Sequence, residues 1–148
     1  MSIQQPTAAR PITSRYAGIG LVAGIVELTL ITAYIHLTLG GPLFTLNAIG
    51  YALLALAVVA ASLAPASLKR FGWVPRIGLA GYTAATLGAY LVIGPYFDLG
   101  WIAKGIEVAI LTLLGADLLR RYGSPAGLLR AALDSLGVGR DEGRMRTA

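Results

Sequence analysis

The sequence predicts an all-α integral membrane protein, a bundle of four transmembrane helices built from two duplicated helical hairpins arranged as a parallel repeat. Three observations support this prediction. Of the 148 residues, 56% are hydrophobic and 13% are charged, which is about half the charged fraction of a typical soluble domain. The apolar residues gather in four long segments, and one short stretch of sequence occurs twice.

Four segments are long enough to cross a lipid bilayer. A membrane-spanning helix needs about 20 mostly apolar residues, and residues 16–39, 43–64, 77–96 and 99–119 meet this requirement. Gly-Pro turns join the first segment to the second and the third to the fourth, whereas a longer basic loop joins the second to the third. The transmembrane domain is therefore expected to cover residues 16–123, after a polar N-terminal arm at residues 1–15.

The basic residues indicate the direction of the chain in the membrane. Eleven of the twelve lie before the first segment, between the second and third, or after the fourth, while Lys104 lies inside the fourth. Positive charge stays on the cytoplasmic side, so we expect a multi-pass protein of the plasma (inner) membrane with both termini in the cytoplasm. At the inner edge, Asp117 is expected to form a solvated pair with Arg120 and Arg121.

The formal net charge of +5 does not indicate a nucleic-acid partner. The arginines lie close to the ends of the apolar segments, where the anionic headgroups of membrane lipids are better partners than a duplex. Membrane lipids are therefore expected to contact this chain, and nucleic acid is not.

A short helix is expected after the last segment, over residues 124–137. Ser124 is placed as its N-cap, Pro125 as its first residue and Gly137 as its end. Leucines recur there at helical spacing, which is typical of an amphipathic helix on the inner membrane surface; docking onto a soluble partner is the alternative. Residues 138–148 are expected to be disordered.

The repeated stretch reads GPLFTLNAI at residues 41–49 and GPYFDLGWI at residues 94–102. A second pair of matches, LKRFG at 68–72 and LRRYG at 119–123, occurs in the same order. We interpret the chain as two copies of one hairpin, at about residues 16–72 and 73–123. Both copies have the same orientation, so a pseudo-twofold axis is expected along the membrane normal.

Small residues recur at the spacing that allows close helix packing. Gly20 and Gly24 form a GxxxG motif in the first segment, and Gly78, Gly81 and Gly88 line one stripe of the third. We interpret these glycines as contacts between helices of the same chain. Dimerisation through one of these faces is the alternative.

Three ionisable residues, Glu27, Lys104 and Glu107, lie inside the apolar segments. Each costs about 2.5–3.5 kcal/mol to insert into a membrane. The first and fourth helices of an up-and-down bundle are neighbours, so these side chains are expected to share one charged cluster, with Glu27 near the midplane. The cluster has three interpretations: a structural contact, proton or ion coupling, or binding of a small ligand such as a quinone head.

His36 is the only histidine of the chain. With Tyr34, it is a candidate for a polar or pH-sensitive contact near the outer edge of the membrane. Glu27 lies nine residues earlier, about half a turn round the helix, so the two side chains face different seams. One histidine and no cysteine leave no metal site and no bis-histidine haem, and no cofactor is expected.

A polar and aromatic ridge follows the third segment. Tyr82, Thr86 and Tyr90 recur at helical spacing, and we interpret them, like the aromatic residues at the ends of the segments, as anchors at the membrane interface. Asn47, just inside the second segment, is expected to cap that helix; a hydrogen bond across to a neighbouring helix is the alternative.

No sequence motif indicates an enzyme. A P-loop, a dinucleotide-binding glycine pattern and an HExxH motif are all missing from the sequence. We therefore expect a non-catalytic subunit or accessory component of a larger membrane complex, partnered by other subunits or by copies of itself. The alternatives are a small oligomeric transporter or channel that uses the charged cluster, and a binder of lipid or quinone.

Overall fold

The computed structural model describes residues 12–138, with side chains from Tyr16 onward, and every regular element in that range is a helix. The elements are α1 (Ile12–Leu39), α2 (Pro42–Leu63), the 3-10 helix η1 (Lys69–Phe71), α3 (Trp73–Ile93), α4 (Asp98–Tyr122) and α5 (Pro125–Ser135). Residues 1–11 of the predicted polar arm and 139–148 of the predicted disordered tail lie outside the described range. Residues 12–15, also assigned to the arm, instead form the start of α1.

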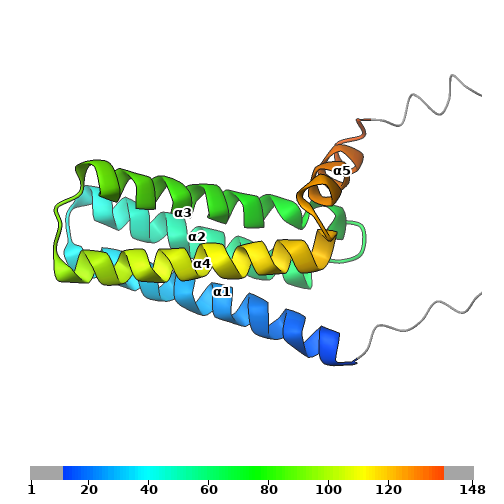
Figure 1. The fold of residues 1–148 in the computed structure, drawn as a ribbon, viewed down its shortest axis with the longest axis horizontal. Coiled ribbons are helices and arrows are strands. Elements are labelled where there is room, and N and C mark those ends of the chain that lie inside the picture. Colours follow the sequence, from blue (N-terminus) through cyan, green and yellow to red (C-terminus); the bar gives the residue numbers. More distant parts are fainter. Residues whose placement is uncertain (1–11, 139–148) are drawn as a thin grey trace, which may run out of the picture.

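Four long helices lie side by side, and α5 leans away from one end of the bundle (Figure 1). α1 packs along α2 and α4, whereas α3 packs against α4 and more loosely against α2. The start of α1, the η1 loop and the end of α4 all lie at the same end (Figure 1). We call this the η1 end, and the other the turn end.

Three stretches of the described chain are long and apolar enough to cross a membrane: Tyr16–Leu39, Pro42–Leu63 and Lys69–Ile93. They support a multi-pass membrane protein. α4 is 25 residues long but is not among these three stretches. The fold is therefore a bundle of four helices, three of which are apolar enough to span by composition alone.

The two Gly-Pro sequences play different structural roles. Pro42 is the first residue of α2, a position where proline loses no hydrogen bond. Pro95 instead lies in an extended loop, and α4 begins only at Asp98. The Tyr90 hydroxyl donates to the Phe97 carbonyl at 3.3 Å and accepts from the Phe97 amide at 3.3 Å. This contact ties the loop to α3.

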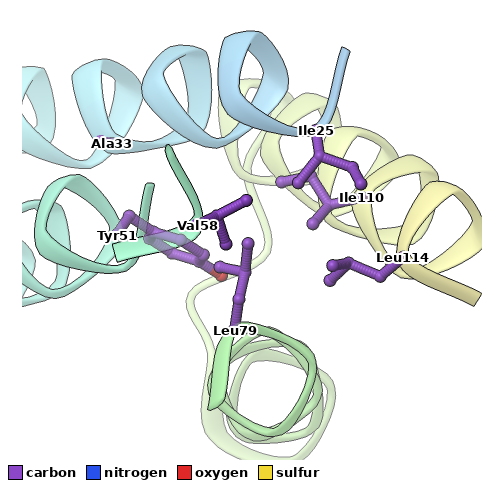
Figure 2. Packing of buried hydrophobic residues seen from close by; sticks show 7 residues of the cluster. All are labelled: Ile25, Ala33, Tyr51, Val58, Leu79, Ile110 and Leu114. Atoms are coloured by element: carbon purple, nitrogen blue, oxygen red, sulfur yellow. The ribbon is translucent and has the colours of Figure 1, made fainter. Parts of the chain in front are cut away.

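Apolar side chains from all four helices meet in the middle of the bundle (Figure 2). They are fully buried or nearly so, and we call them the central layer: Ile25, Ala33, Tyr51, Val58, Leu79, Ile110 and Leu114. Burying a side chain of this size contributes about 1.5–3 kcal/mol in water, whereas between membrane helices the gain is close packing. The layer fixes the rotation of each helix about its axis.

A buried ionic cluster holds the η1 end together. The Arg76 Nε donates to Asp117 Oδ2 at 2.8 Å, and Arg120 and Arg121 donate to the same carboxylate at 3.0 and 2.7 Å. The predicted pairing of Asp117 with Arg120 and Arg121 is confirmed, but its predicted solvation is wrong, because Asp117 has no exposed surface. α3 covers the carboxylate with Arg76, a partner that the sequence alone places in a loop.

The C-terminal helix begins where its capping residues predict. The Ser124 side chain accepts a hydrogen bond from the Gly127 amide at 3.0 Å, and Pro125 is the first helical residue. α5 is attached to the bundle by Trp73, whose Nε1 donates to Ser135 Oγ at 3.1 Å.

The predicted packing glycines divide into two groups. A methyl group added at Gly24 or Gly78 would lie in ordinary contact with a neighbouring helix, 3.4 Å from Leu113 and 3.5 Å from Leu54. Gly20, Gly81 and Gly88 face open space, with nothing within 4 Å of an added methyl. Packing within the chain therefore does not explain these three glycines.

Candidate functional site

An ion pair lies inside the bundle on α4. The Lys104 Nζ donates to both carboxylate oxygens of Glu107, at 2.6 and 2.7 Å. Glu107 has no exposed surface and Lys104 is 6% exposed. Three residues separate the two positions, which places both side chains on one face of the helix. The structure therefore brings these two predicted site residues together.

Glu27 is not part of this cluster, contrary to the prediction. Its side chain is exposed, and Tyr34, two turns further along α1, is exposed to 68%. Thr29 and Thr32 on the opposite side of α1 are buried. The physical reason is helical geometry: at about 100° per residue, Glu27 and Tyr34 share the outward face of α1.

His36 occupies the place beside the ion pair that was expected for Glu27. Its imidazole is 3% exposed, and its Nε2 lies 3.8 Å from Glu107 Oε1. Nδ1 lies 2.7 Å from the Thr32 carbonyl oxygen. A carbonyl only accepts hydrogen bonds, so Nδ1 carries the hydrogen and Nε2 faces the carboxylate.

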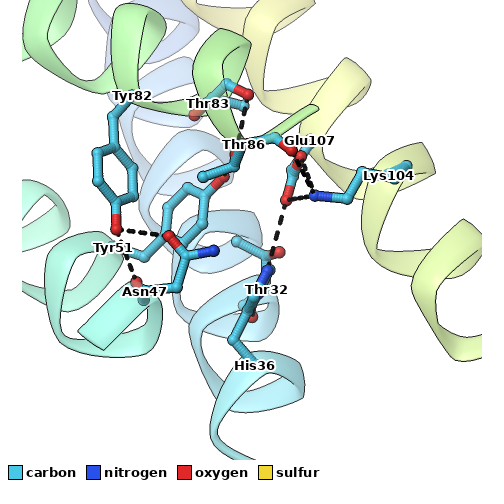
Figure 3. Close-up of polar contacts among 9 residues, drawn as sticks. All are labelled: Thr32, His36, Asn47, Tyr51, Tyr82, Thr83, Thr86, Lys104 and Glu107. Atoms are coloured by element: carbon cyan, nitrogen blue, oxygen red, sulfur yellow. Dashed lines mark hydrogen bonds and ion pairs between the residues drawn. The ribbon is translucent and has the colours of Figure 1, made fainter. Parts of the chain in front are cut away.

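A second polar group lies between α2 and α3 (Figure 3). Tyr51 and Thr86 share a hydrogen bond of 2.6 Å between their hydroxyl groups. The Tyr82 hydroxyl donates to Asn47 Oδ1 at 2.6 Å, and its ring meets the Tyr51 ring edge-on. Asn47 therefore bonds across to α3, and the predicted role as a helix cap is not observed.

A partly enclosed cavity of about 330 Å³ opens next to these groups, at the turn end of the bundle. Most of its wall is apolar or aromatic and comes from all four long helices and the α3–α4 loop. The polar side chains among its lining residues are His36, Asn47, Tyr82, Thr86, Tyr90 and Lys104. This size falls in the range of ligand cavities, about 300–1,000 Å³.

Two close approaches shape the wall of this cavity. A side-chain carbon at Gly50 would collide with the Tyr82 hydroxyl, and one at Gly100 would collide with the Tyr90 ring. These glycines, which the sequence analysis did not single out, allow both tyrosines to lie flat against the neighbouring helix. The i, i+4, i+8 spacing of Tyr82, Thr86 and Tyr90 is the sequence signal that reveals this wall.

The described residues contain no group of three His, Asp or Glu side chains that could hold a metal ion. The site instead combines hydrogen-bonding side chains and an ion pair inside an apolar cavity.

No protein-family model, curated protein or solved structure matches the chain. Function is therefore argued from the geometry of the chain itself.

Proposed function

We propose that this chain is a non-catalytic subunit or accessory component of a larger membrane complex, and that it contacts its neighbour through the outward face of α1. The observation that carries the proposal is the position of Glu27. Its carboxyl group is exposed on the bundle surface, near the middle of the apolar stretch Tyr16–Leu39. That surface would otherwise face lipid.

A carboxyl group in this position is costly without a partner. An acidic residue at the centre of a bilayer costs about 2.5–3.5 kcal/mol on the insertion scale, and such residues normally face protein or water. The interior of this bundle does not supply the partner, because Glu27 points away from it. A neighbouring helix that donates hydrogen bonds to Glu27 would remove this cost.

The residues around Glu27 suit a helix contact. Gly20 and Ala23 lie about two turns and one turn before it on the same outward face, and both are exposed. Small residues let two helix backbones approach closely in a membrane. Gly81 and Gly88 supply a second outward-facing small surface on α3.

The chemistry of the partner is a hydrogen-bond donor or a cation at mid-membrane depth. A second copy of this chain fits less well, because Lys104, the basic residue of the bundle interior away from the η1 end, is already bound to Glu107. Two copies meeting through α1 would place one Glu27 against the other. A different polypeptide is therefore the favoured neighbour.

We propose that the chain crosses the plasma (inner) membrane four times, with both termini in the cytoplasm. The η1 end, which carries most of the basic residues, would lie inside. α5 would rest on the inner membrane surface, where Leu129, Leu133 and Leu136 are exposed. The two hairpins would be copies of one ancestral unit.

Transport through a single chain is less well supported. Between the Lys104–Glu107 pair and Asp117, α4 places Ile110 and Leu114 inward, both buried. The other side chains of the central layer fill the interior of the bundle at the same depth (Figure 2). No polar path joins the two ionic clusters across this layer among the described residues.

The test is purification of tagged full-length chain, gently extracted from its own membrane, followed by native mass spectrometry. Wild-type chain is expected to carry at least one other polypeptide in fixed ratio, and Glu27→Leu to lose it. Thr112→Leu is the matched control, since Thr112 is an exposed polar residue on α4. Wild-type chain without a partner, or equal retention in Glu27→Leu, contradicts the proposal.

A further inference from the structure

The cavity at the turn end has the properties of a binding site that the complex proposal does not use. Five of the polar side chains drawn in Figure 3 line it, namely His36, Asn47, Tyr82, Thr86 and Lys104, and its walls include Phe44, Ala85, Ala89 and Ile93. We infer that it binds a neutral, lipophilic molecule whose head carries carbonyl oxygens, such as the ring of a membrane quinone.

The first reason is that the free polar groups of the cavity are donors. The Tyr82 hydroxyl donates to Asn47 Oδ1, which fixes the orientation of the amide and leaves Asn47 Nδ2 pointing away from Tyr82 (Figure 3). Lys104 has two hydrogens on Glu107, while its third lies near the Thr86 carbonyl at a long 3.4 Å. An oxygen atom of a ligand could accept hydrogen bonds from both Asn47 Nδ2 and Lys104 Nζ.

Two of the acceptors beside the cavity are already used. Glu107 accepts from Lys104 with both oxygens, and Thr86 Oγ1 shares its hydrogen bond with Tyr51. The buried hydroxyl groups of Thr32 and Thr83 have no hydrogen-bond partner in the described part of the chain. A ligand that brings acceptor oxygens therefore fits this site better than one that brings donors.

The second reason concerns charge. The Lys104–Glu107 pair is neutral as a unit. A carboxylate entering this enclosure would be an uncompensated buried charge, which is strongly unfavourable at low dielectric. A neutral carbonyl carries no such cost.

The third reason is the residue composition of the cavity lining. Tyr82 and Tyr90 on α3 and Phe44 on α2 are among the lining residues, so aromatic surface is available to a flat ring. The cavity is only partly enclosed, at the loosely packed seam between α2 and α3, which leaves room for an apolar tail to extend outward. A fatty acid shares the lipophilic body and the acceptor oxygens but adds the negative charge.

The experiment uses full-length chain in nanodiscs, titrated separately with decylubiquinone and with oleic acid at pH 7.5 and followed by tryptophan fluorescence. Saturable binding of decylubiquinone is expected, with oleic acid at least tenfold weaker. Ala89→Phe fills the cavity and should weaken decylubiquinone binding at least tenfold. Its matched control is Ala84→Phe, also exposed on α3 but outside the cavity lining, which should change binding less than twofold.

Asn47→Leu provides a second variant, since it removes the free amide donor without filling the cavity. A lost hydrogen bond of about 0.5–1.5 kcal/mol corresponds to an affinity about 2- to 12-fold lower. Absence of saturable decylubiquinone binding overturns the inference, as does an equal effect of Ala89→Phe and Ala84→Phe. Tighter binding of oleic acid than of decylubiquinone would contradict the inference that the head group of the ligand is neutral. None of these outcomes depends on whether a partner polypeptide binds Glu27.

Discussion

The guanidinium group of Arg76 and the carboxylate of Asp117 lie 2.8 Å apart at the η1 end, with side-chain exposures of 1% and 0%. They join α3 to α4 across 41 residues of sequence. Arg76 also donates to the Gly72 carbonyl and to Ser62 Oγ, so its side chain links η1, α2, α3 and α4. Because Asp117 accepts from three arginines, it is the centre of this end of the bundle.

The first prediction follows from that position. Asp117→Leu should lower the free energy of unfolding by about 3–5 kcal/mol, because it leaves Arg76 buried without a countercharge. Arg120→Ala should cost less than about 1 kcal/mol, since the Arg120 side chain is 29% exposed and solvent screens its charge. Thermal unfolding in detergent measures both. Equal losses in the two variants would contradict the central role of Asp117.

The second prediction concerns the Lys104–Glu107 pair. Lys104→Met and Glu107→Leu should each destabilise the bundle by about 3–5 kcal/mol, because each leaves one buried charge without its partner. The double variant should lose clearly less than the sum of the single losses, since it removes both charges together. A double-mutant cycle by thermal unfolding gives the coupling energy. A coupling near zero would show that the two side chains do not interact as described.

The third prediction separates inward-facing from outward-facing glycines. Gly50→Ala should destabilise the fold by about 1–3 kcal/mol, because its methyl group would collide with the Tyr82 hydroxyl and force a shift. Gly20→Ala has open space around it and should stabilise α1 by up to about 1 kcal/mol through helix propensity. Thermal unfolding of the isolated chain compares the two. The same sign in both variants would contradict the helix rotations seen here.

The fourth prediction tests the proposed topology with single cysteines, which the chain allows because it contains none. Ser67→Cys lies at the η1 end and Tyr96→Cys at the turn end, both at exposed positions. In intact cells a membrane-impermeant maleimide should label Tyr96→Cys, whereas Ser67→Cys should be labelled only after the membrane is opened. The reverse pattern would place the termini outside.

Much of the fold could be predicted from the sequence because long apolar segments and Gly-Pro turns are local signals. α2 and α5 begin within one residue of their predicted starts. α3 begins at Trp73, four residues before the predicted start, because Pro75 falls in the first helical turn, where proline is tolerated. α3 ends at Ile93 because Gly94 and Pro95 do not continue the helix.

The candidate site was only partly predictable, because charge alone does not tell which way a side chain points. Glu27 and His36 both interrupt the first apolar segment, and their spacing shows that they face different sides. The sequence does not show which of the two sides is inward. That choice depends on how α1 packs against α2 and α4, which is non-local information.

The hydrogen bond from Trp73 Nε1 to Ser135 Oγ joins residues 62 positions apart and has a consequence for biogenesis. Ribosomes add about 5–20 residues per second, so Ser135 is made about 3–12 s after Trp73. Throughout that interval the start of α3 lacks its cover from α5, and Arg76 lacks its acid until α4 emerges. Assembly of the η1 end must therefore wait until Ser135 has been made, which makes this end the last part of the described bundle to be completed.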